Sequence, residues 1–177
     1  MKSTTPNYIV GIGGSAGALN AYKALIKYLP LDSGMAFVII SHINPAAESQ
    51  LAQILSRHTK MPVRVASDAM PIEANHVYVI PADADLEVDK YFFKVITPRS
   101  RRNNQIDLFF VSLAETLGAH AIGVILSGYA GEGTKGCQQI QAKGSPTLAP
   151  AKPAAVDGTP NGANEPNGVN VAIVSES

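Results

Sequence analysis

The chain has 177 residues, 46% of them hydrophobic and 16% charged, which is typical of one soluble globular domain with a sizeable core. Its 14 basic and 14 acidic residues give zero net charge, which argues against nucleic acid or an anionic membrane as a partner. A single cysteine, Cys137, excludes an internal disulfide and a cysteine-rich zinc site. No apolar run approaches the roughly 20 residues that span a bilayer, and the N-terminus lacks the apolar region of a secretory signal. We therefore expect a cytoplasmic protein without membrane insertion.

The first half of the chain predicts strands alternating with helices. Residues 7–14 are a short apolar run that ends in glycines, which indicates a buried strand. Apolar residues at helical spacing predict a helix over 18–30, closed by Pro30. Residues 35–42 form a continuous apolar run, as in parallel strands buried on both faces. A short helix over 49–58 and strands over 61–67 and 76–82 follow.

The second half predicts one departure from this alternation. Residues 85–96 alternate apolar and charged side chains around Asp89-Lys90, which indicates a β-hairpin. An amphipathic helix over 105–120, a strand over 121–127, a helix over 135–143 and short strands over 146–151 and 169–175 complete the series. Residues 152–168 are rich in Pro, Gly, Asn and Ala, which indicates a loop.

The fold class expected is therefore α/β, with a mostly parallel, doubly wound sheet, helices on both faces and a hairpin insertion near 85–96. Functional sites in such sheets lie beyond the carboxyl ends of the strands. The residues that end strands are accordingly the first candidates for a functional site.

The end of the first strand fits two motifs. Gly11, Gly13 and Ala16 match the dinucleotide fingerprint, whereas the G-x-S-x-G pattern around Ser15 matches a nucleophile elbow. The dinucleotide interpretation requires an acidic residue at the end of the second strand, but that strand ends in His42. A serine nucleophile requires an adjacent base, and histidine titrates close to neutral pH. Ser15 and His42 therefore favour nucleophilic catalysis.

A catalytic imidazole also requires an acceptor for its second nitrogen, and this acceptor is usually a carboxylate. Glu132 follows the strand over 121–127 within a loop that contains four glycines, LSGYAGEGTKG. The same loop has the glycine spacing of a phosphate-binding loop, but Thr134 and Lys135 stand in the exchanged order and Glu132 would repel phosphate. The order serine, histidine, acid also differs from that of the α/β-hydrolases.

Four segments in this order resemble the catalytic domain of the CheB-type chemotaxis protein-glutamate methylesterases. They are GIGGSAGA at 11–18, ISHINP at 40–45, AMPIEANHVYVIPADADLEV at 69–88 and SGYAGEGTKG at 127–136. The resemblance implies that Ser15 is the nucleophile, His42 the base and Glu132 the acid, where the family generally has aspartate. It further implies an enzyme without metal or cofactor that hydrolyses glutamate methyl esters on the cytoplasmic helices of chemoreceptors. Some members of this family also deamidate glutamine.

The resemblance extends to expectations about the rest of the chain. We expect residues 1–177 to form a single catalytic domain without the family's receiver domain, and 152–168 to match the family least well. Backbone N–H groups of Ala16 and Tyr129 flank the expected point of attack and are the predicted oxyanion donors. Tyr129 and Ala130 replace the residues that the family usually has before the acid.

Structural interpretations stand beside the functional ones. Ser15 could cap a helix, and Glu132 could be an acid favoured by a helix dipole. The three arginines that follow the hairpin either are solvated or dock an acidic receptor helix; they are Arg99, Arg101 and Arg102. Three further histidines are interpreted as structural; they are His58, His76 and His120. The rival function is a catalytically impaired family member that binds a receptor or another partner.

Overall fold

A computed structural model describes residues 4–42, 45–100, 104–127, 133–150 and 171–173. Its main sheet has seven strands in the order β3-β4-β2-β1-β7-β8-β9, and β1 lies near the middle. All neighbouring pairs are parallel except β8 and β9, which are antiparallel. The sheet is thus mostly parallel, as the alternation of strands and helices predicts.

The elements follow one another in the expected order. The strands are β1 (Ile9–Ser15), β2 (Ala36–His42), β3 (Val63–Val65), β4 (Val77–Val79), β5 (Asp85–Asp89), β6 (Phe92–Ile96), β7 (Ala121–Ser127), β8 (Thr147–Pro150) and β9 (Val171–Ile173). The α-helices are α1 (Leu19–Tyr28), α2 (Pro45–Ser56), α3 (Gln105–Leu117) and α4 (Thr134–Ala142). Two short 3-10 helices are η1 (Ala16–Ala18) and η2 (Gly118–His120).

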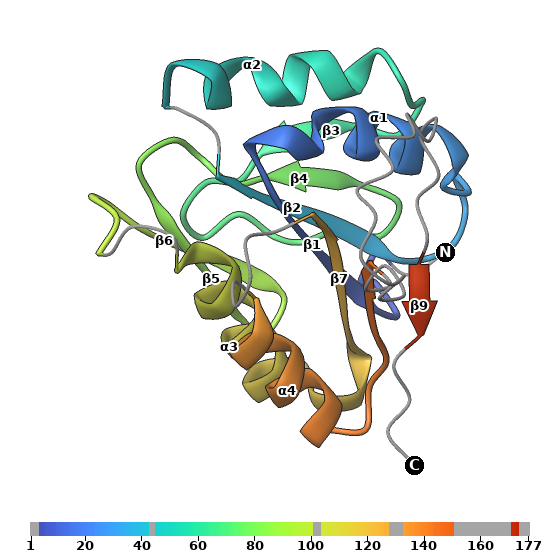
Figure 1. The fold of residues 1–177 in the computed structure, drawn as a ribbon, viewed down its shortest axis with the longest axis vertical. Helices are drawn as coiled ribbons and strands as arrows, with labels where there is room; N and C mark the ends of the chain where they lie inside the picture. Colours follow the sequence, from blue (N-terminus) through green and yellow to red (C-terminus); the bar gives the residue numbers. More distant parts are fainter. Residues whose placement is uncertain (1–3, 43–44, 101–103, 128–132, 151–170, 174–177) are drawn as a thin grey trace, which may run out of the picture.

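Helices cover both faces of the sheet, which confirms the doubly wound architecture. Figure 1 shows α1 and α2 on one face and α3 and α4 on the other. The hairpin of β5 and β6 forms a separate antiparallel sheet on the face of α3, as the pattern of residues 85–96 predicts.

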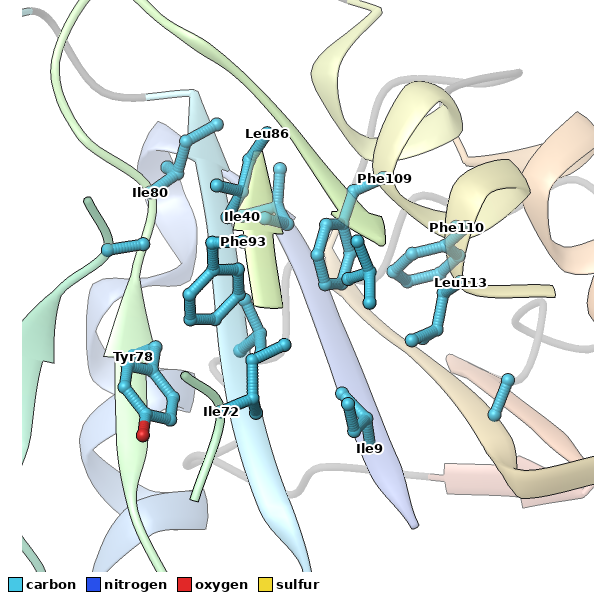
Figure 2. Packing of buried hydrophobic residues seen from close by; sticks show 14 of the residues in the cluster. Ile9, Ile40, Ile72, Tyr78, Ile80, Leu86, Phe93, Phe109, Phe110 and Leu113 are labelled. Carbon is cyan, nitrogen blue, oxygen red and sulfur yellow. The ribbon is translucent and has the colours of Figure 1, made fainter. Parts of the chain in front are cut away.

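Each face of the sheet has its own apolar core. Figure 2 shows the core on the α3 side, where Phe109 and Phe110 lie over β1 and Phe93 of the hairpin packs near Tyr78. The rings of Tyr78 and Phe93 meet edge to face with centroids 5.0 Å apart. The opposite core is built from side chains of α1 and α2 against the other face of β1, β2 and β4. With both faces covered, the central strands are apolar at almost every position.

The topology creates a switch point between β1 and β7. The chain leaves β1 through α1 toward β2, and it leaves β7 through α4 toward β8, on the opposite face and in the opposite direction. In open α/β sheets, ligands bind outside the carboxyl ends of the strands where the direction reverses in this way. Ser15 ends β1 and Ser127 ends β7, so the predicted catalytic region adjoins this switch point.

Candidate active site

Ser15 and His42 end two neighbouring parallel strands and are partners in the register of β1 and β2. The backbones of paired residues on adjacent strands lie about 4.8 Å apart, so two such side chains can reach each other. For His42 the described part is the backbone. The fold therefore brings the backbone of the predicted nucleophile directly beside that of the predicted base.

The capping interpretation of Ser15 does not fit the structure. Ser15 stands at the N-cap position of η1 in an extended conformation, but its side chain makes no capping hydrogen bond. Ala16, a predicted oxyanion donor, is the first residue of η1. The N–H groups of the first residues of a helix have no partner within that helix, and a substrate can use them.

The glycines of β1 serve helix packing. A methyl group at Gly11 would lie 2.6 Å from the ring of Phe110, and one at Gly13 would lie 2.8 Å from Cγ2 of Ile106. Both contacts are shorter than real Cβ contacts, so these glycines allow α3 to approach β1 closely. Because both glycines lie inside the strand, they do not form the tight turn that binds a pyrophosphate. The dinucleotide interpretation is therefore not supported.

The third predicted corner of the site follows β7. Ser127 pairs with Gly14 of β1, and the next described residue, Gly133, is the N-cap of α4. Tyr129 and Glu132 lie outside the described residues. Gly133 has a φ of +82°, and a methyl group there would lie 2.6 Å from Cδ1 of Ile125. The residue that follows Glu132 is thus held against β7 in a backbone conformation that favours glycine.

The first turn of α4 already binds a carboxylate. The N–H of Gly136 donates a 2.8 Å hydrogen bond to Oδ1 of Asp107, which lies on α3. Helix N-termini attract anions, and here an acidic side chain uses one of the donors a phosphate would require. This contact weighs further against a phosphate-binding loop. Burial, and to a lesser extent Asp107, raises the pKa of Cys137 to about 11, so its thiol is not poised as a nucleophile.

A network around Asp85 fixes the segment before α3. The Asp85 carboxylate is buried and accepts hydrogen bonds from the N–H of Ser100 (2.8 Å), the Ser100 hydroxyl (2.5 Å) and Nε2 of Gln105 (3.3 Å). This network joins the hairpin to the N-terminus of α3. The adjacent residue of that helix, Ile106, is the one that packs beside Gly13 and Gly133. Asp85 therefore supports the same end of the sheet as Ser15.

Arg99 lies in the segment between β6 and α3. Its Nε is 3.8 Å from Oδ1 of Asp83, which follows β4, and its backbone N–H donates to the carbonyl of Asp83. It is therefore held at the carboxyl edge of the sheet. Arg101 and Arg102 lie outside the described residues.

The remaining histidines differ from His42 in their position along the strands. His76 directly precedes β4, and its Nδ1 lies 2.8 Å from the carbonyl of Ala74. His120 directly precedes β7, and its Nδ1 lies 3.0 Å from the carbonyl of Asn7. Both therefore lie at the amino ends of strands, at the opposite edge of the sheet from Ser15, and both rings contact a backbone carbonyl group. His58 precedes β3 after α2 and is likewise remote from the carboxyl edge.

Sequence patterns did not reveal Asp85 and Asp107 as supports of this region. Asp85 begins a strand in which charges alternate with apolar residues, and Asp107 follows Ile106 in the first turn of α3. The only local signal at Asp107 is an acid near the start of a helix, which a favourable helix dipole explains equally well, and Asp85 has no such signal. Their partners, Ser100 and Gly136, lie 15 and 29 residues away along the chain.

Two features of the described ranges bear on other functions. No group of three or more His, Cys, Asp or Glu side chains in these ranges could hold a metal ion. No helix formed by the described residues combines the length and apolarity needed to cross a bilayer.

Comparison with known proteins agrees with this geometry. The family model for CheB methylesterase matches residues 10–176. A protein-glutamate methylesterase/protein-glutamine glutaminase of Hydrogenovibrio crunogenus is 32% identical over 146 residues, covering 79% of this chain and 39% of the relative. One of Saccharophagus degradans is 32% identical over 154 residues, covering 84% of this chain and 44% of the relative. The chain thus spans less than half the length of these curated relatives.

A solved structure shares the fold. The Thermotoga maritima CheB methylesterase catalytic domain superimposes with a TM-score of 0.71 at 26% sequence identity, covering 79% of this chain and 77% of that one. The match of folds and the family match over residues 10–176 coincide over most of the chain. The chain therefore belongs to the CheB methylesterase family.

Proposed function

We propose that this chain is a serine hydrolase that removes methyl groups from glutamate methyl esters on the cytoplasmic helices of chemoreceptors. The observation that carries the proposal is the pairing of Ser15 with His42 at the carboxyl ends of adjacent strands, beside the switch point between β1 and β7. Side chains alternate along a strand, so position 15 shares a face with Gly11 and Gly13, and position 42 shares that same face with Ile40. This common face supports a direct proton transfer between the two residues.

The reaction follows from the chemistry of these groups. The Ser15 oxygen attacks the ester carbonyl while the His42 imidazole accepts the hydroxyl proton, which gives a tetrahedral oxyanion. Donors from the backbone of Ala16 and Tyr129 stabilise this oxyanion. The bond to the methoxy oxygen then breaks, His42 protonates the leaving group, and methanol departs from an acyl-enzyme. Water, deprotonated by His42, attacks the acyl group and restores Ser15 and a free glutamate.

Glu132 completes this arrangement as the orienting acid. The proposal is supported by its described chain neighbour Gly133, which lies against Ile125 of β7 and Ile106 of α3. A carboxylate there would hold the second imidazole nitrogen and stabilise the imidazolium. The same acyl-enzyme would form from a glutamine side chain with loss of ammonia, which accounts for deamidation as a second reaction.

Arg99, together with Arg101 and Arg102, is proposed to contact the acidic surface of the receptor helix. Arg99 lies at the carboxyl edge and already pairs with Asp83 at 3.8 Å. Its guanidinium has five donors, so it can hold Asp83 and a second carboxylate together.

A series of Glu132 variants tests whether the chain is an enzyme or a binding module. Methanol release from a methylated receptor fragment would be measured for the wild type, Glu132→Asp and Glu132→Gln. Loss of an orienting carboxylate lowers kcat by up to about 10⁴-fold, so Glu132→Gln should be strongly impaired while Glu132→Asp retains or gains activity. Equal release above background by all three proteins would remove Glu132 from the mechanism. Wild type and variants that are equally inert, yet bind the receptor fragment, would establish the binding module instead.

A further inference from the structure

A second surface lies at the opposite end of the sheet from Ser15. Helix α1 ends before β2 begins, and α2 ends before β3 begins, so both helices finish at the amino ends of the parallel strands. Figure 1 shows the C-termini of α1 and α2 on the same side of the molecule. Between them lies an open hollow of about 420 Å³ that we term the basic hollow, lined by Lys27, Leu29, Leu31, Arg57, His58, Thr59 and Lys60.

The charge of the basic hollow has one sign. Lys27, Arg57 and Lys60 contribute three permanent positive charges, and the lining contains no carboxylate. None of these three cations forms an ion pair with another residue in the part of the chain the structure describes. The whole chain has zero net charge, so this concentration of positive charge is a local feature.

Large apolar side chains lie beside these cations in contact with solvent. Tyr28 is 79% exposed and Leu31 is 47% exposed, although burying such side chains is normally favourable. Nζ of Lys27 is 5.7 Å from the centre of the Tyr28 ring, which places the ring next to the basic hollow. Exposed apolar groups rimmed by polar ones are typical of protein interaction sites, and Tyr and Arg are enriched there.

The backbone that presents these side chains is held in place. The N–H of Leu29 donates to the carbonyl of Ile26, and those of Arg57 and His58 donate to the last turn of α2. The hydroxyl of Thr59 accepts from the N–H of Met61. A rigid backbone lowers the entropic cost of binding a partner.

Helix electrostatics explain only part of this arrangement. A cation in the last turn of a helix is favoured by the dipole, which accounts for Lys27. It does not account for Lys60, four residues beyond the end of α2, or for the exposure of Tyr28 and Leu31.

We propose that the basic hollow binds an acidic segment of a partner protein, with carboxylates against Lys27, Arg57 and Lys60 and an apolar side chain against Tyr28 and Leu31. Complementary charge selects the carboxylates, and the apolar pair distinguishes a peptide from a simple anion. The surface is remote from the carboxyl edge, so this proposal does not depend on the proposed esterase activity.

The probe is a fluorescein-labelled peptide with several glutamates around one leucine, and its anisotropy is measured against the full chain. A matched peptide with glutamines should bind at least about tenfold more weakly, and added salt should weaken binding of the acidic peptide. Lys27→Glu/Lys60→Glu should weaken binding at least about tenfold, whereas Lys90→Glu/Lys143→Glu, with the same change in net charge at exposed sites elsewhere, should not. Tyr28→Ala should weaken it several-fold.

Additional variants and competitors test the same surface. Lys27→Gln/Lys60→Gln provides a milder change if charge reversal impairs folding, and it should also weaken binding. Methanol release should stay at the wild-type level in both lysine pairs. Equal weakening by the two charge-reversal pairs, or equal binding of the glutamine peptide, would overturn the proposal. So would full competition by inorganic polyphosphate or single-stranded DNA combined with wild-type affinity in Tyr28→Ala, because the surface would then bind polyanions in general.

Discussion

The contact between α3 and α4 at Gly136 is the tightest glycine contact in the described part of the chain. A methyl group at this position would lie 2.4 Å from Cβ of Phe110, whereas carbon atoms in contact are about 3.5–4.0 Å apart. Cβ of Phe110 is one bond from the backbone and cannot rotate away. Gly136→Ala therefore requires the two helices to separate by about 1 Å.

Two effects of opposite sign decide the stability of Gly136→Ala. Alanine in place of glycine within a helix stabilises it by about 1 kcal/mol. Overpacking a rigid contact destabilises by about 1–3 kcal/mol, and more where backbone must move. We expect the second effect to prevail, with a net loss of about 1–2 kcal/mol in the free energy of unfolding.

Urea unfolding followed by circular dichroism measures this loss, which corresponds to a fall in the midpoint of about 0.5–1 M. Gly17→Ala is the matched control, because a methyl group at Gly17 meets nothing within 4 Å. It should change the free energy of unfolding by less than about 0.5 kcal/mol. A Gly136→Ala protein as stable as the wild type, or more so, would refute the steric argument.

A Phe110→Leu background separates backbone from ring contacts. Leucine keeps the Cβ atom, so the cost of Gly136→Ala should remain in this background. At Gly11 the contact is with the Phe110 ring, at 2.6 Å, so the cost of Gly11→Ala should fall when the ring is removed. If Phe110→Leu lowered the cost of Gly136→Ala and of Gly11→Ala by the same amount, the distinction between backbone and ring contacts would be contradicted.

Two further predictions concern the buried Asp85 and the partly buried Cys137. Asp85→Ala removes the acceptor shared by Ser100 and Gln105, so we expect a loss of about 2 kcal/mol in urea unfolding, and an unchanged midpoint would contradict the network. Burial, together with Asp107, raises the pKa of Cys137 from 9.0 to about 11, so the thiol ionises more easily in the unfolded chain. The free energy of unfolding should therefore fall as pH rises from 9 toward 11, with a contribution from Cys137 of about 1 kcal/mol by about pH 10. Cys137→Ala should lack this contribution in parallel melts, and identical pH dependence of the two proteins would refute it.

Local patterns predicted the elements that form the centre of the sheet. The apolar runs that became β1, β2 and β7 are buried on both faces, so their sequences carry a strong and simple signal. The hairpin followed from alternation around Asp89-Lys90. Helix α2 begins at Pro45 rather than near residue 49. Proline is favoured at the first helical position, but the first turn lacks the apolar periodicity from which the helix was predicted.

Contacts distant along the chain could not be predicted in this way. The glycines of β1 matched two functional motifs, and their role against Phe110 and Ile106 appeared only once α3 was placed. The bond from Gly136 to Asp107 likewise depends on how α3 and α4 pack. The strand ends were predictable because parallel topology places their carboxyl ends along one edge of the sheet, and this brings Ser15 beside His42.

Methanol release from a methylated chemoreceptor fragment, wild type against Ser15→Ala, tests the proposed activity most directly. The serine hydroxyl is small, so Ser15→Ala should fold and bind a receptor fragment as the wild type does, and circular dichroism and receptor binding serve as controls. We predict steady release by the wild type and a rate lower by about 10⁴-fold or more in Ser15→Ala. Release by Ser15→Ala at the wild-type rate would show that Ser15 is not the nucleophile.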